Sequence, residues 1–132
     1  MRHFRTVILH HTSRHGSHYD WLLEDPAQPG GLLWAARVIH ASDAWLSMGA
    51  FTLQPIAPHR RRYLSYEGPI SGGRGQVRRV DEGVFVPRLW CEHRTVLDVS
   101  LGRFEGRVEM RRVSAACWKA SVQREVVPAD DW

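Results

Sequence analysis

Several residue types and patterns are scarce in this chain of 132 residues. Its two cysteines, Cys91 and Cys117, are too few for the disulfide framework of a small secreted protein. No apolar run approaches the roughly 20 residues that a membrane-spanning helix needs. The first residues also lack the apolar core and cleavage site of a signal peptide. These absences favour a cytoplasmic protein with reduced thiols.

Lysine is almost absent, because only Lys119 among the 18 lysines and arginines is a lysine. The guanidinium group of arginine is a planar fork that binds a phosphate through two hydrogen bonds. The arginines also gather in runs at 59–62, 74–79 and 107–112, as expected of a nucleic-acid track. With a formal net charge of +4, this bias indicates an anionic partner.

No stretch keeps a 3.6-residue apolar period long enough to predict a helix. Short runs rich in β-branched and aromatic residues recur instead, separated by glycine and proline. We expect strands at 4–11, 17–24, 31–39, 61–68, 75–83, 92–101, 103–112 and 117–123. This spacing predicts an all-β fold, a single small β-barrel, closed or partly open, of about eight antiparallel strands with short connecting turns. The chain, 1–132, is then one domain with its core at 4–123 and a C-terminal tail at 124–132.

Four of the eight histidines lie in the segment HHTSRHGSHYDWLLE, residues 10–24. Side chains alternate along a strand, so His18 and Asp20 share one face and the apolar side chains between them occupy the other. A hairpin closed by residues 12–17 would bring His11 opposite His18, with Cβ atoms about 5 Å apart. The pattern therefore predicts two imidazoles and a carboxylate on one face of a hairpin.

Two imidazoles and one carboxylate are a ligand set that suits Mn, Fe or Zn, with positions left open for a substrate. Alternation by itself does not choose between His10 and His11 as the first ligand. A chance gathering of surface histidines in a hairpin loop is the alternative explanation.

A second polar segment, PHRRRYLSYEGPISGGRG at 58–75, places His59 four residues before Tyr63 and ends in a glycine-rich bend. Together with HYDWLLE, it resembles the 3′-phosphoesterase domain of bacterial DNA ligase D, including its stand-alone forms. That family carries a histidine, then His-Tyr-Asp with a nearby Leu-Glu, and later a histidine four residues before a tyrosine. An aromatic-Glu-Gly and a glycine-rich turn follow in both. The resemblance spans residues 4–123.

The resemblance implies a small β-barrel that binds Mn²⁺, or another divalent transition metal, through His11, His18 and Asp20. Such domains process 3′ ends of DNA and of RNA-tipped primers in DNA break repair, removing a terminal ribonucleoside and then a 3′-phosphate. His59 and Tyr63 match the residues that lie at the scissile phosphate in that family. The implied partners are DNA or RNA/DNA primer 3′ ends and a separate ligase or end-joining protein, with no membrane.

The chain departs from the family pattern in its cations. Leu22 stands where the family has an arginine, two residues after the metal-binding aspartate, and the lysine after the Trp-Ala strand is missing. Arg37, Arg62 and Arg74 are the candidate substitutes for binding phosphate. Because residues 18, 20 and 22 share a face, we expect Leu22 to leave a gap beside the phosphate and to weaken activity. It also supports a degenerate domain that binds nucleic-acid ends without cutting.

A second enzyme class fits part of the same pattern. His18 and Asp20, followed by a distant histidine, also match the facial triad of non-haem iron oxygenases on β-barrel folds. His93 would then be the third metal ligand, and Arg103 would bind an acidic cosubstrate.

Overall fold

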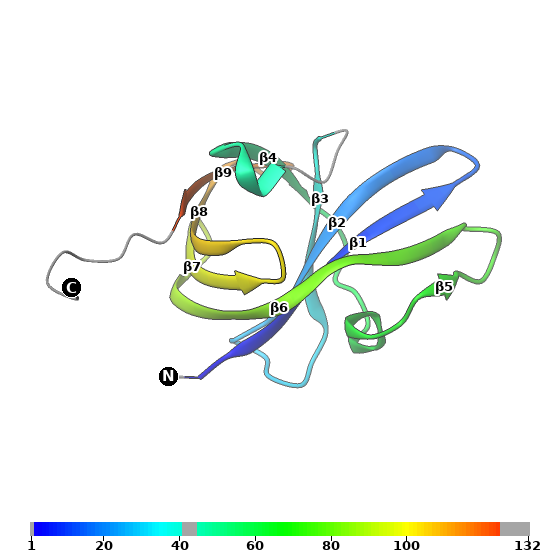
Figure 1. Cartoon of the computed structure of the whole chain (residues 1–132), viewed down its shortest axis with the longest axis horizontal. Helices are drawn as coiled ribbons and strands as arrows, with labels where there is room; N and C mark the ends of the chain where they lie inside the picture. Colours follow the sequence, from blue (N-terminus) through cyan, green and yellow to red (C-terminus); the bar gives the residue numbers. More distant parts are fainter. Residues whose placement is uncertain (1, 41–44, 125–132) are drawn as a thin grey trace, which may run out of the picture.

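The computed structural model describes residues 2–40 and 45–124, so the expected tail lies outside the described residues except for its first position. Nearly all of the described chain is β-structure (Figure 1). The strands are β1 (Phe4–Ser13), β2 (Gly16–Glu24), β3 (Leu33–Val38), β4 (Ala50–Pro55), β5 (Gly68–Pro69), β6 (Gln76–Trp90), β7 (Arg94–Leu101), β8 (Glu105–Ser114) and β9 (Cys117–Arg124). Two 3₁₀ turns, η1 (Trp45–Ser47) and η2 (Arg61–Leu64), complete the elements. The described residues include no helix long and apolar enough to span a membrane.

All neighbouring strands are antiparallel, in the order β1-β2-β3-β4-β9-β8-β7-β6-β5. Because β1 also pairs with β6, the sheet closes in an uneven, barrel-like ring. The short β5 pairs with the start of β6 outside that ring. Figure 1 shows the β1–β2 hairpin and the β5–β6 turn extending together beyond the closed part of the sheet. The predicted all-β barrel of antiparallel strands is therefore confirmed.

The sheet buries apolar side chains on both faces at β1, β2 and β3. The larger cluster fills the ring and includes Trp21 and Leu23 of β2, with Phe85 of β6. A smaller cluster lies on the opposite face of the same strands, where Leu22 is 0% exposed and packs with Leu9. Side chains from the segment that contains η2 cover this smaller cluster. Strict alternation along β2 thus supplies two cores and not one core and one open face.

Three strand predictions were wrong in part. Residues 50–55 form β4, a strand that we did not expect; it ends at Pro55, and Pro58 follows closely. β6 continues through Pro87, where a shift in register between residues 87 and 89 accommodates the proline. The expected strand 61–68 is instead the η2 turn and its continuation, because Leu64 is buried against the smaller cluster and not in a sheet.

Candidate metal centre

The β1–β2 hairpin brings three potential metal ligands together. Its register pairs His11 with His18, as the hairpin geometry predicted. The Nδ1 atom of His11 lies 3.2 Å from Nε2 of His18, and that same Nε2 lies 3.3 Å from Oδ2 of Asp20. One ligand atom from each of the three residues lies within 4.8 Å of the others. Within the described part of the chain, these three side chains form a group that could hold a metal ion.

The structure separates His11 from its neighbour His10. His10 projects from the other face of β1, and its ring stacks on Tyr19 with centroids 4.6 Å apart. His11 shares the face of His18, against which its ring packs edge-on at 4.8 Å. The choice between the two histidines, which the sequence left open, therefore falls on His11.

A backbone carbonyl orients the His11 ring. Nε2 of His11 lies 2.7 Å from the carbonyl oxygen of Arg74. A carbonyl oxygen can only accept a hydrogen bond, so Nε2 carries the hydrogen and donates it. In the neutral ring the lone pair is then on Nδ1, the atom that faces His18. Metal-binding histidines are commonly held in this way, with the second ring nitrogen donating to a carbonyl or carboxylate.

The surroundings of the two other ligands shift their pKa values in opposite directions. Burial, together with the charge of Arg37, lowers the pKa of His18 to about 4, so its imidazole is neutral at pH 7. Burial raises the pKa of Asp20 to about 6, against the opposing effect of Arg37. Asp20 is 3% exposed, and its Oδ1 atom has no hydrogen-bond partner within the described chain.

An unpartnered buried carboxylate oxygen is costly in a protein, because burial removes its hydration without replacing it. A divalent cation bound by both carboxylate oxygens would supply the missing partner of Oδ1 and would favour the ionised carboxylate beside the two imidazoles. The donor set of His11, His18 and Asp20 therefore fits a divalent transition metal.

A groove of about 730 Å³ runs over this cluster, between the β1–β2 hairpin, the end of β3 and the turn before β6. Its ionisable lining residues are Arg14, Arg37 and Arg74 together with four histidines, and none of the described residues that line it is acidic. Arg37 of β3 lies opposite Asp20 of β2 in the strand register. The buried Nε of Arg37 has no hydrogen-bond partner in the described chain. The groove therefore brings positive charge close to the candidate ligands His11 and His18, which line it.

The candidate phosphate-binding arginines differ in their surroundings. Arg37 and Arg74 line the groove. The Arg74 side chain bends back and donates from Nε to the carbonyl of Ser71, at 2.7 Å. Arg62 is exposed and is not among the described residues that line the groove. Its guanidinium lies 4.3 Å from the ring centre of Tyr66. Arg37 is therefore the candidate that lies nearest to the metal ligands in the sheet.

The η2 turn brings His59 and Tyr63 together. In an extended strand, residues four apart would be separated by about 13 Å, whereas the two ring centres lie 5.7 Å apart. Backbone hydrogen bonds of 2.8 and 3.0 Å hold His59 beside Leu33, and its Nδ1 donates to the carbonyl of Ala57 at 2.9 Å. Tyr63 packs against the smaller cluster that contains Leu22, so this pair lies over the face of β2 that carries His18 and Asp20.

The structure corrects the role expected for Leu22. It lies on the same face as His18 and Asp20, but the smaller cluster encloses it completely. The position two residues after Asp20 therefore has a packing role, and it is not a gap beside a phosphate. A second cation at this position would be buried away from water among apolar side chains.

Replacing Leu22 with arginine should accordingly destabilise the protein and should not raise its activity. We expect a loss of at least about 3 kcal/mol of unfolding free energy, from the lost packing of Leu22 and the burial of a charged group. Urea denaturation of the variant measures this loss. Leu32→Arg is the matched control, because Leu32 is 52% exposed and should change stability by less than about 0.5 kcal/mol. Equal stability of Leu22→Arg and the wild type would contradict the assignment.

The third ligand of the oxygenase alternative is not at this site. His93 lies in the turn between β6 and β7, where its carbonyl accepts a hydrogen bond from the backbone of Arg112. The group of potential ligands among the described residues includes His11 and does not include His93. The facial triad expected from His18, Asp20 and His93 is therefore not formed.

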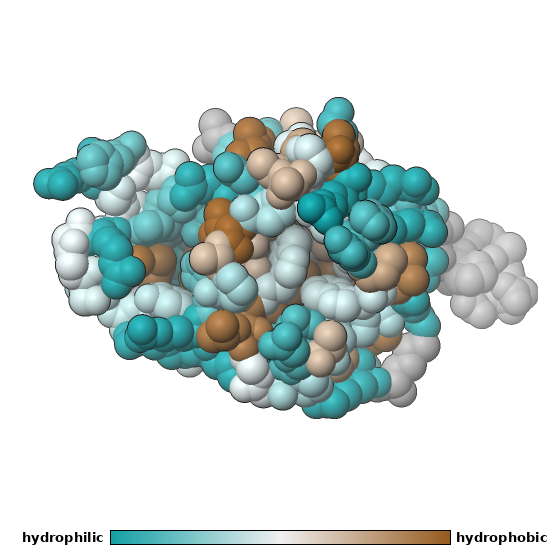
Figure 2. All heavy atoms as spheres, turned by 180° about the vertical axis from the view of Figure 1, so that it is seen from behind, coloured by the Kyte–Doolittle hydropathy of each residue, from teal (hydrophilic) through white to brown (hydrophobic). Residues whose placement is uncertain are grey.

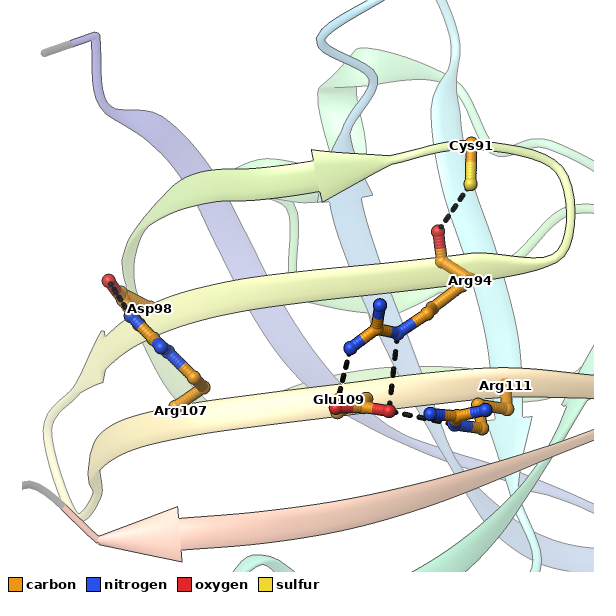
Figure 3. A network of polar contacts seen from close by, with 6 residues as sticks. All are labelled: Cys91, Arg94, Asp98, Arg107, Glu109 and Arg111. Atoms are coloured by element: carbon orange, nitrogen blue, oxygen red, sulfur yellow. Dashed lines mark hydrogen bonds and ion pairs between the residues drawn. The ribbon is translucent and has the colours of Figure 1, made fainter.

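The third arginine run does not form the expected open track. On the outer face of β7 and β8, Glu109 lies between Arg94 and Arg111, and Asp98 pairs with Arg107 (Figure 3). The Nε atoms of Arg111 and Arg107 lie 2.7 and 2.8 Å from their carboxylates. Carboxylates already bind these guanidinium groups, so this run does not offer a row of unpaired arginines to a nucleic acid.

Sequence reasoning missed two contributions to the site. The carbonyl of Arg74 is a backbone group, and the only signal for it is the run of glycines that lets the chain approach His11. The second is the ion pair between Glu24 and Arg61, at 2.8 Å, which connects the η2 turn to β2. The sequence identified Glu24 as part of a motif but did not indicate this partner. No protein-family model matches the chain, and no curated protein matches it.

Proposed function

We propose that this protein is a metal-dependent phosphoesterase that processes the 3′ ends of nucleic-acid strands, with Mn²⁺ as its expected metal. The observation that carries the proposal is the cluster of His11, His18 and Asp20 beneath a groove whose described ionisable lining is basic. The donor set suits a divalent transition metal, and the groove suits a phosphate chain. The resemblance of the sequence to 3′-phosphoesterase domains supplies the reaction, namely removal of a 3′-phosphate or of a terminal ribonucleoside.

Each residue has a role that its position supports. A bound divalent ion would polarise the phosphoryl oxygens and lower the pKa of a water molecule. Arg37, next to Asp20, would bind a non-bridging phosphate oxygen through its fork of donors. The Nδ1 atom of His59 already donates to a backbone carbonyl, so this residue would act through Nε2. It would protonate the leaving oxygen or stabilise the negative charge that develops there. Tyr63 packs against the His59 ring and holds its direction.

The surface agrees with a polar partner. Seen from behind, hydrophobic residues form scattered patches among hydrophilic ones (Figure 2). The exposed large hydrophobic residues of the described chain are Leu32, Ile39, Met48, Val84, Leu89 and Val113. Single exposed hydrophobic residues of this kind are ordinary on protein surfaces, so the basic groove is the better candidate for a binding site.

A primer that ends in a 3′-phosphate tests the proposed function directly. Purified protein with Mn²⁺ should release inorganic phosphate, and a chelator should stop the release. Excess Mn²⁺ added back should restore it. Strand binding without any release at saturating Mn²⁺ would instead favour a module that binds ends without cutting, and absence of both would exclude a nucleic-acid substrate.

The electrostatic part of the proposal predicts a steep dependence on salt. Log affinity for a single strand should fall linearly with log salt, with a slope of about 0.7 for each phosphate neutralised. Arg37→Ala should lower this slope by about one phosphate contact. Arg111→Ala is the matched control, because Glu109 already binds its guanidinium on the outer face of β8. An equal slope for both variants, measured by fluorescence anisotropy, would remove Arg37 from the binding surface.

A further inference from the structure

We propose that the turn at residues 70–75 is a positioning element for the metal centre, and that Gly75 is the residue that allows it to act. The turn holds the carbonyl of Arg74 against Nε2 of His11, at 2.7 Å, and so directs the Nδ1 lone pair toward the metal position. This inference rests on the metal binding in the proposed function, and it concerns a residue that contributes no ligand of its own.

The turn is held in one shape by its own contacts. The backbone N–H of Ile70 donates to the carbonyl of Gly75 at 2.7 Å, at the point where β5 and β6 pair. The Arg74 side chain donates to both oxygens of Ser71, at 2.7 and 3.1 Å. Its peptide group is therefore fixed from within the turn, and its carbonyl is left directed at the His11 ring.

Gly75 lets this turn lie directly against β1. A Cβ atom at position 75 would lie 1.9 Å from the carbonyl oxygen of Thr12 and 2.8 Å from Cα of Ser13. Both are backbone atoms of the strand that carries His11, so they cannot rotate away as a side chain would. The φ angle of Gly75 is also +85°, in the left-handed region that residues with a Cβ rarely adopt. Any larger residue must displace the turn from β1.

Displacing the turn would release the ring of His11. Without the carbonyl acceptor, the hydrogen of the neutral ring can move to Nδ1, and the ring can rotate about its side-chain bonds. Either change removes the lone pair from the position between His18 and Asp20. Loss of such an outer partner typically lowers metal affinity by about 10–100-fold, because the ligand must be reordered when the metal binds.

Gly83 provides a matched control for this substitution. A Cβ atom at Gly83 would also lie 1.9 Å from a backbone oxygen, that of Ser100. Gly83 pairs with Thr6 on β1, five residues from His11, which is roughly 16 Å along an extended strand. Gly83→Ala should therefore destabilise the fold in a similar way without reaching the metal centre.

The experiment compares Gly75→Ala and Gly83→Ala with the wild type by two measurements. Calorimetric titration with Mn²⁺ alone should show a 10–100-fold weaker affinity for Gly75→Ala and an unchanged affinity for Gly83→Ala. In the metal-free protein, ¹⁵N NMR of the imidazoles should show His11 with its hydrogen on Nε2 in the wild type and in Gly83→Ala only. This second measurement requires neither metal nor activity.

Two results would overturn the inference: wild-type affinity and ring state in Gly75→Ala, or equal losses of affinity in both glycine variants. If Gly75→Ala does not fold, Arg74→Ala decides the matter, because it removes both contacts with Ser71 without a clash. Unchanged affinity and ring state in that variant would equally overturn it. Absence of Mn²⁺ binding by the wild type itself would refute the proposed metal centre, whereas the NMR result would still report on the turn.

Discussion

Replacing Asp20 with asparagine is expected to abolish measurable Mn²⁺ binding while the fold is retained. The two side chains have nearly the same shape, so packing in β2 is preserved, but the substitution removes the anionic ligand of the cluster. His18→Ala should have a similar effect, because it removes the central member of the cluster, whose Nε2 contacts both of the other ligands. Isothermal titration with Mn²⁺ measures both losses of affinity. We expect each loss to exceed about 100-fold, because removing a direct ligand weakens metal binding more than removing a hydrogen-bond partner of a ligand.

The metal-free stability of the same variant provides an independent check. Oδ1 of Asp20 is buried without a hydrogen-bond partner in the described chain, and burial of a carboxylate opposes its ionisation. Asp20→Asn should therefore melt at a temperature no lower than that of the metal-free wild type. Glu105→Gln, on the exposed start of β8, controls for the loss of one negative charge. Undiminished Mn²⁺ binding by both Asp20→Asn and His18→Ala would refute the metal centre.

His59→Ala is expected to leave Mn²⁺ binding intact and to remove nearly all 3′-end processing. The three candidate ligands do not include His59, whose backbone lies beside β3 and whose ring contacts Tyr63. A group that transfers a proton or stabilises charge in the transition state typically contributes about 10²–10⁴-fold in rate. Single-turnover release of phosphate, at saturating Mn²⁺, measures this loss apart from any change in metal affinity.

His93→Ala is the appropriate control for His59→Ala, because it also removes one imidazole but lies in the turn between β6 and β7. It should retain wild-type turnover. If His59→Ala were equally active, this imidazole would have no part in the reaction. If instead His93→Ala lost its metal, the ligand set drawn from the β1–β2 hairpin would be wrong.

The strand pattern was sufficient to predict the central part of the site. Alternation along residues 17–24 correctly placed His18 and Asp20 on one face, and the short polar connection correctly placed His11 opposite His18. Both conclusions depend on local geometry, which has a period of two residues and a register set by the turn. The barrel followed from the same periodicity, repeated along most of the chain.

Features that depend on tertiary packing were not predictable in this way. The segment RRYL has the composition of a strand, but it forms a 3₁₀ turn because Leu64 is buried in the smaller cluster. Leu22 was interpreted by comparison with a family arginine, whereas its burial depends on side chains that come from β1, β3 and β6. The carbonyl of Arg74 could not be identified by residue type, because every residue has one.

Because β1–β3 are buried on both faces, different elements hold the candidate metal ligands and the pair of His59 and Tyr63 in place. The three ligands stand on a hairpin, whose pairing alone sets their spacing. His59 and Tyr63 instead depend on a covering segment that is held by Leu64 and by the ion pair between Arg61 and Glu24. Partial opening of that cover would separate the imidazole from the ligands while the hairpin stayed intact. In such a state, a metal bound by the proposed ligands would be retained after the proposed catalytic geometry had been lost.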